Sequence, residues 1–262
     1  MLTPKQTEQF ESLGAVTIDT PLTEQELADA REAYDALFPH ADSEAGRKRS
    51  RHARTADFFD EPLLNIIQHP FFEEVSRQAL NADKIIFNNI GISKTFPRPD
   101  EEFTFQQHTD VQYSLADLDG RPKQMICSFF LWLADVNEKR APLMYRPRSH
   151  RQIAEWRSAD PELSRAAPHV KGEVFENLPD LPFEEPKPIV ASAGQVSVLT
   201  TALIHGPSSN VDTEPRYACH LSYKPKGFKL PLPAGKHAVR DNYVEALKDY
   251  LRPDRLHLVD GV

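Results

Sequence analysis

The sequence predicts a mainly β fold with flanking helices, built as a β-sandwich or a jelly roll. From Lys84 onward, apolar residues occur in short runs separated by turns rich in Pro and Gly. Helical periodicity is confined to the two ends of the chain. The 262 residues contain no Gly/Ser-rich or low-complexity linker. We therefore expect one domain over 1–262, with a helical part at about 1–83, a β core at about 84–226 and a C-terminal helix at about 239–252.

Capping residues and apolar spacing predict the helices. Thr3 and Pro4 are typical of a helix start, and Gly14 is typical of a helix end. A capping box over 23–26 begins the second helix, which has apolar residues along one face. Pro70 is expected to kink the third. The predicted helices cover 4–13, 24–37, 62–80 and 241–251.

Short apolar runs predict the strands, and one segment interrupts their pattern. The predicted strands cover 85–92, 103–107, 125–134, 143–145, 189–191, 195–204 and 217–223. The segment 156–188 is instead polar and rich in Pro and acidic residues. A long irregular insertion is typical of a lid or of a surface loop. Both interpretations remain open for this segment.

Composition excludes several classes of partner. The net charge of −8 argues against nucleic-acid binding, which needs clustered cations. No apolar stretch approaches the roughly 18 residues of a membrane span, and the first residues do not resemble a signal peptide. Cys127 and Cys219 lie in predicted strands, where buried thiols behave as small hydrophobes. We expect a cytoplasmic protein that is a monomer or a weak homodimer, without nucleic-acid or membrane partners.

One basic cluster departs from this acidic composition. Residues 47–54 contain five Lys and Arg residues. One interpretation is a solvated loop whose arginines pair with nearby acidic residues. The other is that Arg49 and Arg51 bind an anionic group of the substrate at the rim of a pocket.

Three residues have the pattern of metal ligands. The residues around His108 and Asp110 are typical of extended chain, and in a strand residues i and i+2 point to the same face. His205 ends a second apolar run and precedes a cluster of turn-forming residues. Two imidazoles and one carboxylate form a facial triad, which leaves three adjacent iron positions open for a chelating cosubstrate and oxygen. The pattern predicts an oxygenase.

Arg216 adds a positive charge to this pattern. It stands eleven residues after His205, immediately precedes the predicted strand 217–223 and is the only Lys or Arg in 216–223. A guanidinium that enters a sheet interior needs a carboxylate or phosphate partner, because an unpaired buried charge is very costly. We therefore expect Arg216 to bind an anionic group.

These residues, together with 141–150, resemble the phytanoyl-CoA dioxygenase family of iron(II)- and 2-oxoglutarate-dependent oxygenases. The resemblance covers most of the chain, including the predicted helices and short strand of 2–37. It implies a double-stranded β-helix (jelly roll, cupin-like) core. It also implies that His108, Asp110 and His205 bind Fe(II) and that Arg216 holds the distal carboxylate of 2-oxoglutarate. The implied reaction uses O2 to hydroxylate, or otherwise oxidise, a C–H bond of a small molecule, with release of succinate and CO2.

The chain departs from the family pattern at two positions. The family usually has Gly where Ala141 stands, and a Pro-Gly-Ser/Thr-His turn where this chain has Pro147-Arg148-Ser149-His150. Both departures concern turn geometry and the substrate pocket and leave the ligands intact. Halogenating relatives replace the carboxylate ligand with a small residue, so Asp110 favours hydroxylation over halogenation.

Four further residues are candidates for the site. Ser128 and Phe130 alternate along one face of the strand 125–134. If that face lines the barrel, Ser128 contacts the cosubstrate and Phe130 contacts the substrate; the alternative is core packing. The same two interpretations apply to Thr200, as a residue that contacts the cosubstrate. Tyr113 is a further candidate for substrate contact.

The sequence leaves some roles and the substrate open. Lys94 reaches either the pocket or the solvent, and we interpret His220 as a supporting histidine rather than a ligand. The competing hypothesis is a cupin-like metal-binding protein or isomerase without oxygenase activity, which gives no role to a cation at Arg216. The arginine cluster and the acidic insertion favour a polar, possibly anionic, small-molecule substrate.

Overall fold

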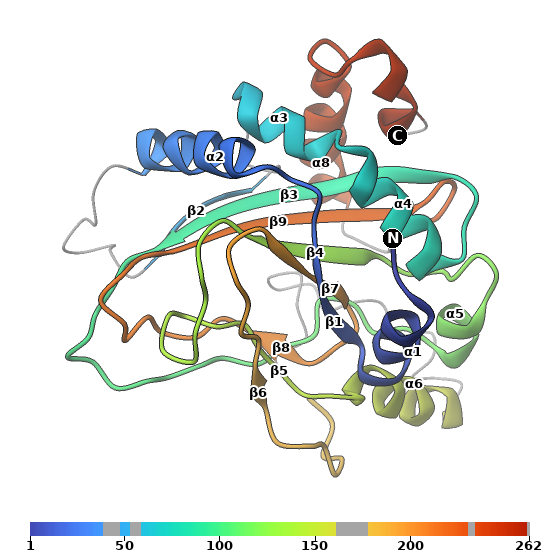
Figure 1. The fold of residues 1–262 in the computed structure, drawn as a ribbon. Helices are drawn as coiled ribbons and strands as arrows, with labels where there is room; N and C mark the ends of the chain where they lie inside the picture. The colour runs from blue at the N-terminus through green and yellow to red at the C-terminus, as the bar shows by residue number, and fades with distance from the viewer. Residues whose placement is uncertain (39–47, 53–58, 161–177, 230–233, 261–262) are drawn as a thin grey trace.

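The computed structural model describes residues 1–38, 48–52, 59–160, 178–229 and 234–260, and its strands form two antiparallel sheets with helices around them (Figure 1). This confirms the predicted mainly β fold. In spatial order, the large sheet contains β1 (Ala15–Asp19), β7 (Gln195–Thr200), β4 (Cys127–Trp132), β9 (Arg216–Pro225), β3 (Ile85–Thr95) and β2 (Lys48–His52). The small sheet contains β6 (Lys187–Pro188), β5 (Met144–Tyr145) and β8 (His205–Gly206).

The N-terminal helices follow the predicted capping signals with one difference, and the helices at 115–119 and 149–159 were not predicted. The described helices are α1 (Pro4–Leu13), α2 (Glu24–Leu37), α3 (Glu61–Ile67), α4 (Pro70–Leu80), α5 (Leu115–Asp119), α6 (Ser149–Ala159), α8 (Ala234–Leu247) and the 3-10 helix η2 (Pro253–Val259). Capping boxes at Thr3 and Thr23 begin α1 and α2. The segment predicted as one kinked helix is instead two, because Pro70 takes the first position of α4 and the His69 ring caps it. Among the described helices, none has the length and apolar character needed to cross a membrane.

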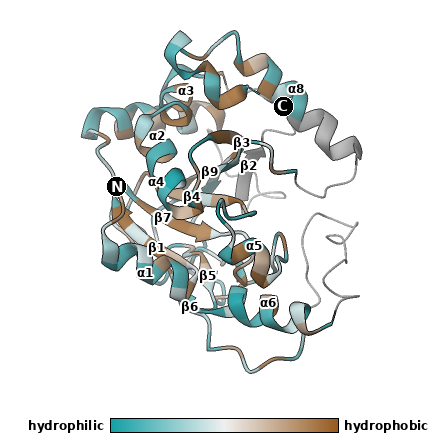
Figure 2. Cartoon of the chain, turned by 90° about the vertical axis from the view of Figure 1, so that its right-hand side faces the viewer, coloured by the Kyte–Doolittle hydropathy of each residue, from teal (hydrophilic) through white to brown (hydrophobic). Residues whose placement is uncertain are grey.

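The two faces of the large sheet have different surroundings. One face packs against α2, α3 and α4, and the small sheet lies on the other side (Figure 1). On the helix side, the ring of Phe129 contacts those of Phe72 and Tyr223 edge-on. Hydrophobic residues are concentrated in the strands of this sheet, whereas α1, α2 and α6 show hydrophilic outer surfaces (Figure 2). The face toward the small sheet is called the inner face below.

Alternation along β9 separates these two environments. Cys219, Leu221 and Tyr223 belong to the hydrophobic core on the helix side. The intervening residues Arg216, Ala218, His220 and Ser222 therefore point to the inner face. The inner face holds the charged and polar side chains.

Several predicted segments differ from the structure. The predicted strands 103–107 and 189–191 contain only isolated bridges, at Phe105 and Ala191. Residues 48–52 of the basic cluster form a strand, β2, paired with β3, and are not the loop that one interpretation assumed. The sequence did not predict this strand because it lacks apolar alternation. The segment 156–188 was expected to be irregular from its start, but α6 continues to Ala159. Most of the proposed lid, 161–177, lies outside the described residues. The C-terminal helix begins earlier than predicted, and η2 follows it.

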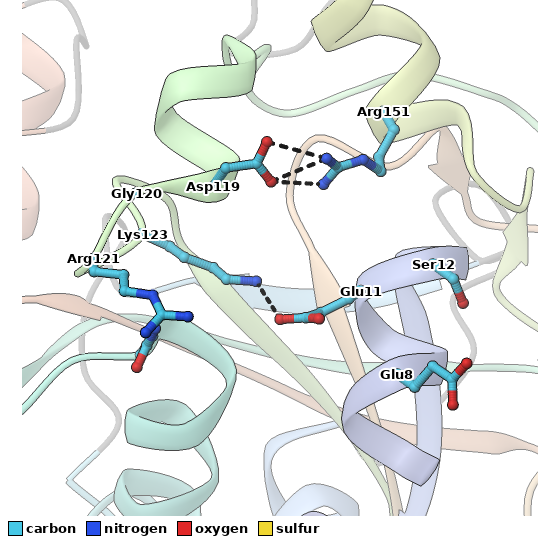
Figure 3. A pocket seen from close by; sticks show the side chains of 9 residues that line it. Glu8, Glu11, Ser12, Asp119, Gly120, Arg121, Lys123 and Arg151 are labelled. Atoms are coloured by element: carbon cyan, nitrogen blue, oxygen red, sulfur yellow. Dashed lines mark hydrogen bonds and ion pairs between the residues drawn. The ribbon is translucent and has the colours of Figure 1, made fainter. Parts of the chain in front are cut away.

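A polar hollow of about 460 Å³ lies between α1, α5 and α6 (Figure 3). Lys123 Nζ is 2.9 Å from Glu11 Oε1. The guanidinium of Arg151 donates to both carboxylate oxygens of Asp119 at 3.0–3.1 Å. These two ion pairs link α1 to the α5 turn and α5 to α6, so we interpret the hollow as a structural junction.

His150 packs the start of α6 against the end of α1. Its Nε2 lies 3.2 Å from the carbonyl oxygen of Glu11, and its Nδ1 is buried without a partner among the described residues. Gly14 has a φ of +84°, and a Cβ there would come within 2.7 Å of His150 Nδ1. Burial lowers the pKa of His150 to about 4, so the ring is neutral at pH 7.

This depressed pKa predicts acid sensitivity. Below about pH 6.5 the unfolded chain protonates His150 while the folded chain does not, so the free energy of unfolding falls until about pH 4. The lost stability is about 3 kcal/mol. Urea unfolding between pH 4 and 7 should show a shallower pH dependence in His150→Gln than in the wild type. Identical pH dependence in the two proteins would contradict the assignment.

Candidate metal centre

Backbone pairing brings the predicted ligands together. His108 lies in an extended segment after β3, and His205 begins β8. The two residues form an antiparallel bridge in which each N–H donates to the other's carbonyl oxygen at 2.9 Å. The N–H of Asp110 donates to the carbonyl oxygen of Thr201 at 3.1 Å. The chain on both sides of the ligands is thus fixed by main-chain hydrogen bonds.

The three side chains converge on one point. The ligand atoms of His108, Asp110 and His205 all lie within 4.8 Å of one another, and no other such group of His, Cys, Asp and Glu occurs in the part of the chain that the structure describes. His108 Nε2 is 3.4 Å from Asp110 Oδ1, and His205 Nε2 is 3.6 Å from Asp110 Oδ2. One metal ion can contact an atom of each residue.

The charge states of these residues suit metal binding. His205 is buried, and desolvation lowers its pKa despite the opposing effect of Asp110, so its ring is neutral. Its Nδ1 lies 2.8 Å from the carbonyl oxygen of Leu203; the N–H there donates, which leaves Nε2 as a free lone pair. Burial alone raises the pKa of Asp110, but His205 and His108 lower it to about 2. Two nitrogen donors and an ionised carboxylate fit an iron(II) ion with open positions.

Arg216 lies on the inner face, and the residue is only 4% exposed. It donates to the carbonyl oxygen of Ala141 at 2.9 Å and to the hydroxyls of Ser93 and Thr95 at 3.1 Å. Its Nε has no partner, and no carboxylate among the described residues pairs with it. The ring of Trp132 lies 5.8 Å from its Cζ. Burial lowers the pKa of Arg216 to about 10, so the group stays charged and suits an anionic ligand.

The two departures from the family pattern share one physical feature. Ala141 has a φ of +43° and Arg148 a φ of +64°, in the left-handed region that glycine occupies without strain. The chain therefore keeps the backbone conformation that a glycine would adopt at both turns. In this conformation the carbonyl oxygen of Ala141 accepts a hydrogen bond from Arg216.

The inner face includes two of the other candidates. Ser128 and Phe130 lie opposite Ser222 and His220 of β9 and share their face. Thr200 does not join them: its strand partner is Cys127, on the helix side, and its hydroxyl lies 3.6 Å from Met125 Sδ. The expectation that Thr200 contacts the cosubstrate is corrected, because alternation along β7 turns it away from the site.

Tyr113 and Lys94 are both occupied by other parts of the protein. The hydroxyl of Tyr113 lies 3.0 Å from Thr201 Oγ1 and accepts from the N–H of Ile126 at 3.0 Å. Tyr113 is buried, so these contacts assign it a structural role rather than the expected substrate contact. Lys94 points to the helix side, where it pairs with Asp35. Lys94 therefore reaches neither the pocket nor open solvent.

The arginines of the basic cluster are placed only through their backbone. β2 sets Arg49 opposite Lys94 and Arg51 opposite Ile92. Their side chains lie outside the described part of the structure, so substrate contact by Arg49 and Arg51 remains a prediction.

Two residues close to the ligands in the chain or in space were not predicted from the sequence. A Cβ on Gly206 would lie 1.8 Å from the carbonyl oxygen of Gln106, so the ligand strands can approach only with glycine there. Arg157 of α6 is buried and donates to Gln112 Oε1 at 2.9 Å, just beyond the ligands. A glycine directly after a ligand histidine could have indicated Gly206. Nothing in the sequence indicated Arg157.

Gly206→Ala should separate the two ligand strands and weaken metal binding at least tenfold, because the Cβ clashes with backbone rather than with a movable side chain. Anaerobic calorimetric titration with iron(II) measures the effect. The matched control is Gly227→Ala, where φ is +89° and nothing lies within 4 Å of the added Cβ. That variant should lose about 1 kcal/mol of stability through strain and keep its metal affinity. Equal metal affinity in the two variants would refute the proposed close approach.

Several solved structures share the fold of this chain. The carbocyclase SnoK from nogalamycin biosynthesis matches with a TM-score of 0.66 at 17% identity, over 91% of this chain and 90% of that one. The epimerase SnoN, crystallised with Fe3+, alpha ketoglutarate and nogalamycin RO, matches with a TM-score of 0.63 at 13% identity, over 85% and 83%. HygX from Streptomyces hygroscopicus, with nickel and 2-oxoglutarate bound, matches with a TM-score of 0.61 at 15% identity, over 88% and 90%. At these identities the matches show a shared fold.

Comparison with curated proteins finds no match. The family model described as phytanoyl-CoA dioxygenase (PhyH) matches residues 10–218, which confirms the resemblance found in the sequence. Because this match spans most of the sequence, the chain belongs to the phytanoyl-CoA dioxygenase family, whose members use iron(II), 2-oxoglutarate and O2.

Proposed function

We propose that the protein is an iron(II)- and 2-oxoglutarate-dependent dioxygenase that hydroxylates a C–H bond of a small molecule. One observation carries the proposal: the buried guanidinium of Arg216 has only neutral partners among the described residues. A buried charge without a countercharge is costly. The far carboxylate of a chelating dicarboxylate would supply that countercharge, in the two-pronged geometry that suits arginine.

The residues of the site have separate roles in this proposal. His108, Asp110 and His205 would hold the iron, and Arg216 would orient 2-oxoglutarate. Bound iron and cosubstrate supply the oxidative chemistry, with release of succinate and CO2. The carbonyl oxygen of Leu203 keeps His205 in the tautomer that offers Nε2. The protein's own contribution is orientation, fixed charge and exclusion of water.

Asp110 bears on the type of oxidation. In halogenating relatives a small residue replaces this carboxylate, so its presence supports hydroxylation. SnoN and SnoK are described as an epimerase and a carbocyclase, and those outcomes belong to those proteins. We assign this chain the simplest outcome, addition of a hydroxyl group at the C–H bond.

The alternative is a cupin-like metal-binding protein or isomerase without oxygenase activity. His108, Asp110 and His205 alone are compatible with it. Arg216 argues against it, because a metal site without a dicarboxylate gives no role to a buried cation that lacks a countercharge.

Anaerobic addition of iron(II) and 2-oxoglutarate to the metal-free protein should produce the weak visible charge-transfer band of the chelate. Arg216→Ala should raise the dissociation constant of 2-oxoglutarate about 30-fold or more, since truncating one partner of a buried charge pair costs about 2 kcal/mol or more. The control is Arg140→Ala, which removes an arginine paired with Asp212 and should leave the band unchanged. Iron binding without any band would support the alternative.

Asp110→Ala should abolish conversion of 2-oxoglutarate to succinate and weaken iron(II) binding at least tenfold, because the ligand set loses its only carboxylate. Succinate quantification and metal titration measure the two effects. Asp119→Ala removes a carboxylate that pairs with Arg151 away from the ligands and should retain both properties. Normal turnover by Asp110→Ala would refute its assignment as a ligand.

A further inference from the structure

Arg146 lies beside one of the two segments that carry the metal ligands. It follows β5, whose last residue, Tyr145, pairs with His205. The N–H of Arg146 donates to the carbonyl oxygen of Ile204 at 2.9 Å. The backbone of Arg146 is therefore attached to the residue that directly precedes a ligand.

A short turn fixes Arg146 in this place. The N–H of Ile204 donates to Ser149 Oγ at 2.8 Å, and the Ser149 hydroxyl donates to the carbonyl oxygen of Arg146 at 2.8 Å. Ser149 is fully buried, so water does not compete for these contacts. With the bond described above, three hydrogen bonds connect the turn 146–149 to the chain before His205. The guanidinium of Arg146 thus extends from a fixed point.

The side chain of Arg146 reaches the second ligand segment. Its Nε donates to Gln107 Oε1 at 3.0 Å, and Gln107 directly precedes His108. The register of the His108–His205 bridge sets Gln107 opposite Gly206, which has no side chain to obstruct the path. Because neighbouring strands lie about 4.8 Å apart, the contact crosses β8 over about 10 Å. Gln107 alternates with His108, so the contact lies on the face of the small sheet away from the ligand side chains.

The amide of Gln107 depends on this contact. Its Nε2 is buried and has no hydrogen-bond partner among the described residues, so within that part of the chain Arg146 is what holds the amide. Arg146 Nη1 also donates to the carbonyl oxygen of Glu184 at 2.9 Å, shortly before β6. One guanidinium therefore joins the His108 segment to β5 and to the chain that leads into β6.

We propose that Arg146 is a positioning residue of the metal centre, which holds the segments of His108 and His205 at the separation that one ion requires. It acts through Gln107 and through its own backbone, without contact with the metal. Main-chain pairing joins the two ligand residues by two hydrogen bonds, and the Arg146 side chain adds a connection on the opposite face. The inference rests on the proposed function, because that proposal assigns the ligands to iron.

The charge of Arg146 makes the direction of its effect informative. A cation near the ligands repels a metal ion, so removal of the charge alone would strengthen metal binding. Loss of the connection to Gln107 would instead weaken it, because the ligands would then have to be brought together when the ion binds. Weaker binding after removal of Arg146 therefore reports geometry rather than charge.

Arg146→Met removes the donors and keeps an unbranched side chain. Anaerobic calorimetric titration with iron(II) should show binding weakened about tenfold, the low end of the effect of residues that support metal ligands. The visible absorption bands of the cobalt(II)-loaded protein, which depend on ligand geometry, should shift. Arg148→Met is the matched control, because Arg148 is exposed and also contacts Glu184, at 3.5 Å. It should leave the iron affinity and the cobalt bands unchanged.

Variants of Gln107 test the same connection from its other end. Gln107→Leu should reproduce both effects, and it carries the test by itself if Arg146→Met does not fold. Gln107→Glu still accepts from the guanidinium and should bind iron(II) at least as tightly as the wild type. Arg146→Met combined with Gln107→Leu should be no weaker than either single variant, because both remove one interaction.

Two outcomes would overturn the inference. Unchanged iron affinity and cobalt bands in Arg146→Met and Gln107→Leu, even with lower stability to urea, would make Arg146 a purely structural residue that fastens the chain near Glu184. A wild-type protein that binds no iron(II) would overturn the proposed function and the inference with it. Titration of the wild type comes first and separates these two failures.

Discussion

The main-chain pairing of His108 with His205 is the constraint on which the rest of the site depends. It joins two segments that are far apart in the chain, and it does so through backbone groups that every residue carries. The side chains that leave this pairing have little freedom to move apart. Gly206 of β8 allows the two ligand segments to approach closely. In the turn before β8, the carbonyl oxygens of Thr201 and Leu203 bind the N–H of Asp110 and the ring of His205. The ligand geometry is therefore a property of strand pairing more than of the ligands themselves.

The large sheet separates two electrostatic environments. Its helix side is filled with apolar side chains, and the ionic groups there, such as Lys94 with Asp35, are paired. Its inner face instead keeps Arg216 charged, buried and without a countercharge among the described residues. Folding tolerates this arrangement because two hydroxyls and a carbonyl oxygen solvate the guanidinium in place of water. The remaining imbalance of charge is the physical basis of the proposal that Arg216 binds an anionic group.

The ligands and Arg216 were predictable because they depend on short-range rules. Strand alternation placed His108 with Asp110, and the cost of an unpaired buried charge singled out Arg216. Thr200 was misplaced because closeness to His205 in sequence was taken as closeness in space, whereas the chain turns between β7 and β8. The strand in the basic cluster was not predicted because it lacks apolar alternation. The close approach of Gly206 to Gln106 was not predicted because it depends on long-range pairing. Such contacts leave no periodic pattern in the sequence.

The turns at Ala141 and Arg148 have a consequence for how relatives of this chain are recognised. Both residues adopt dihedral angles that favour glycine, so this backbone conformation does not require glycine at either turn. A search motif that requires glycine letters at these turns would pass over such a chain. The backbone conformation of the two turns would identify such a chain where residue identity does not.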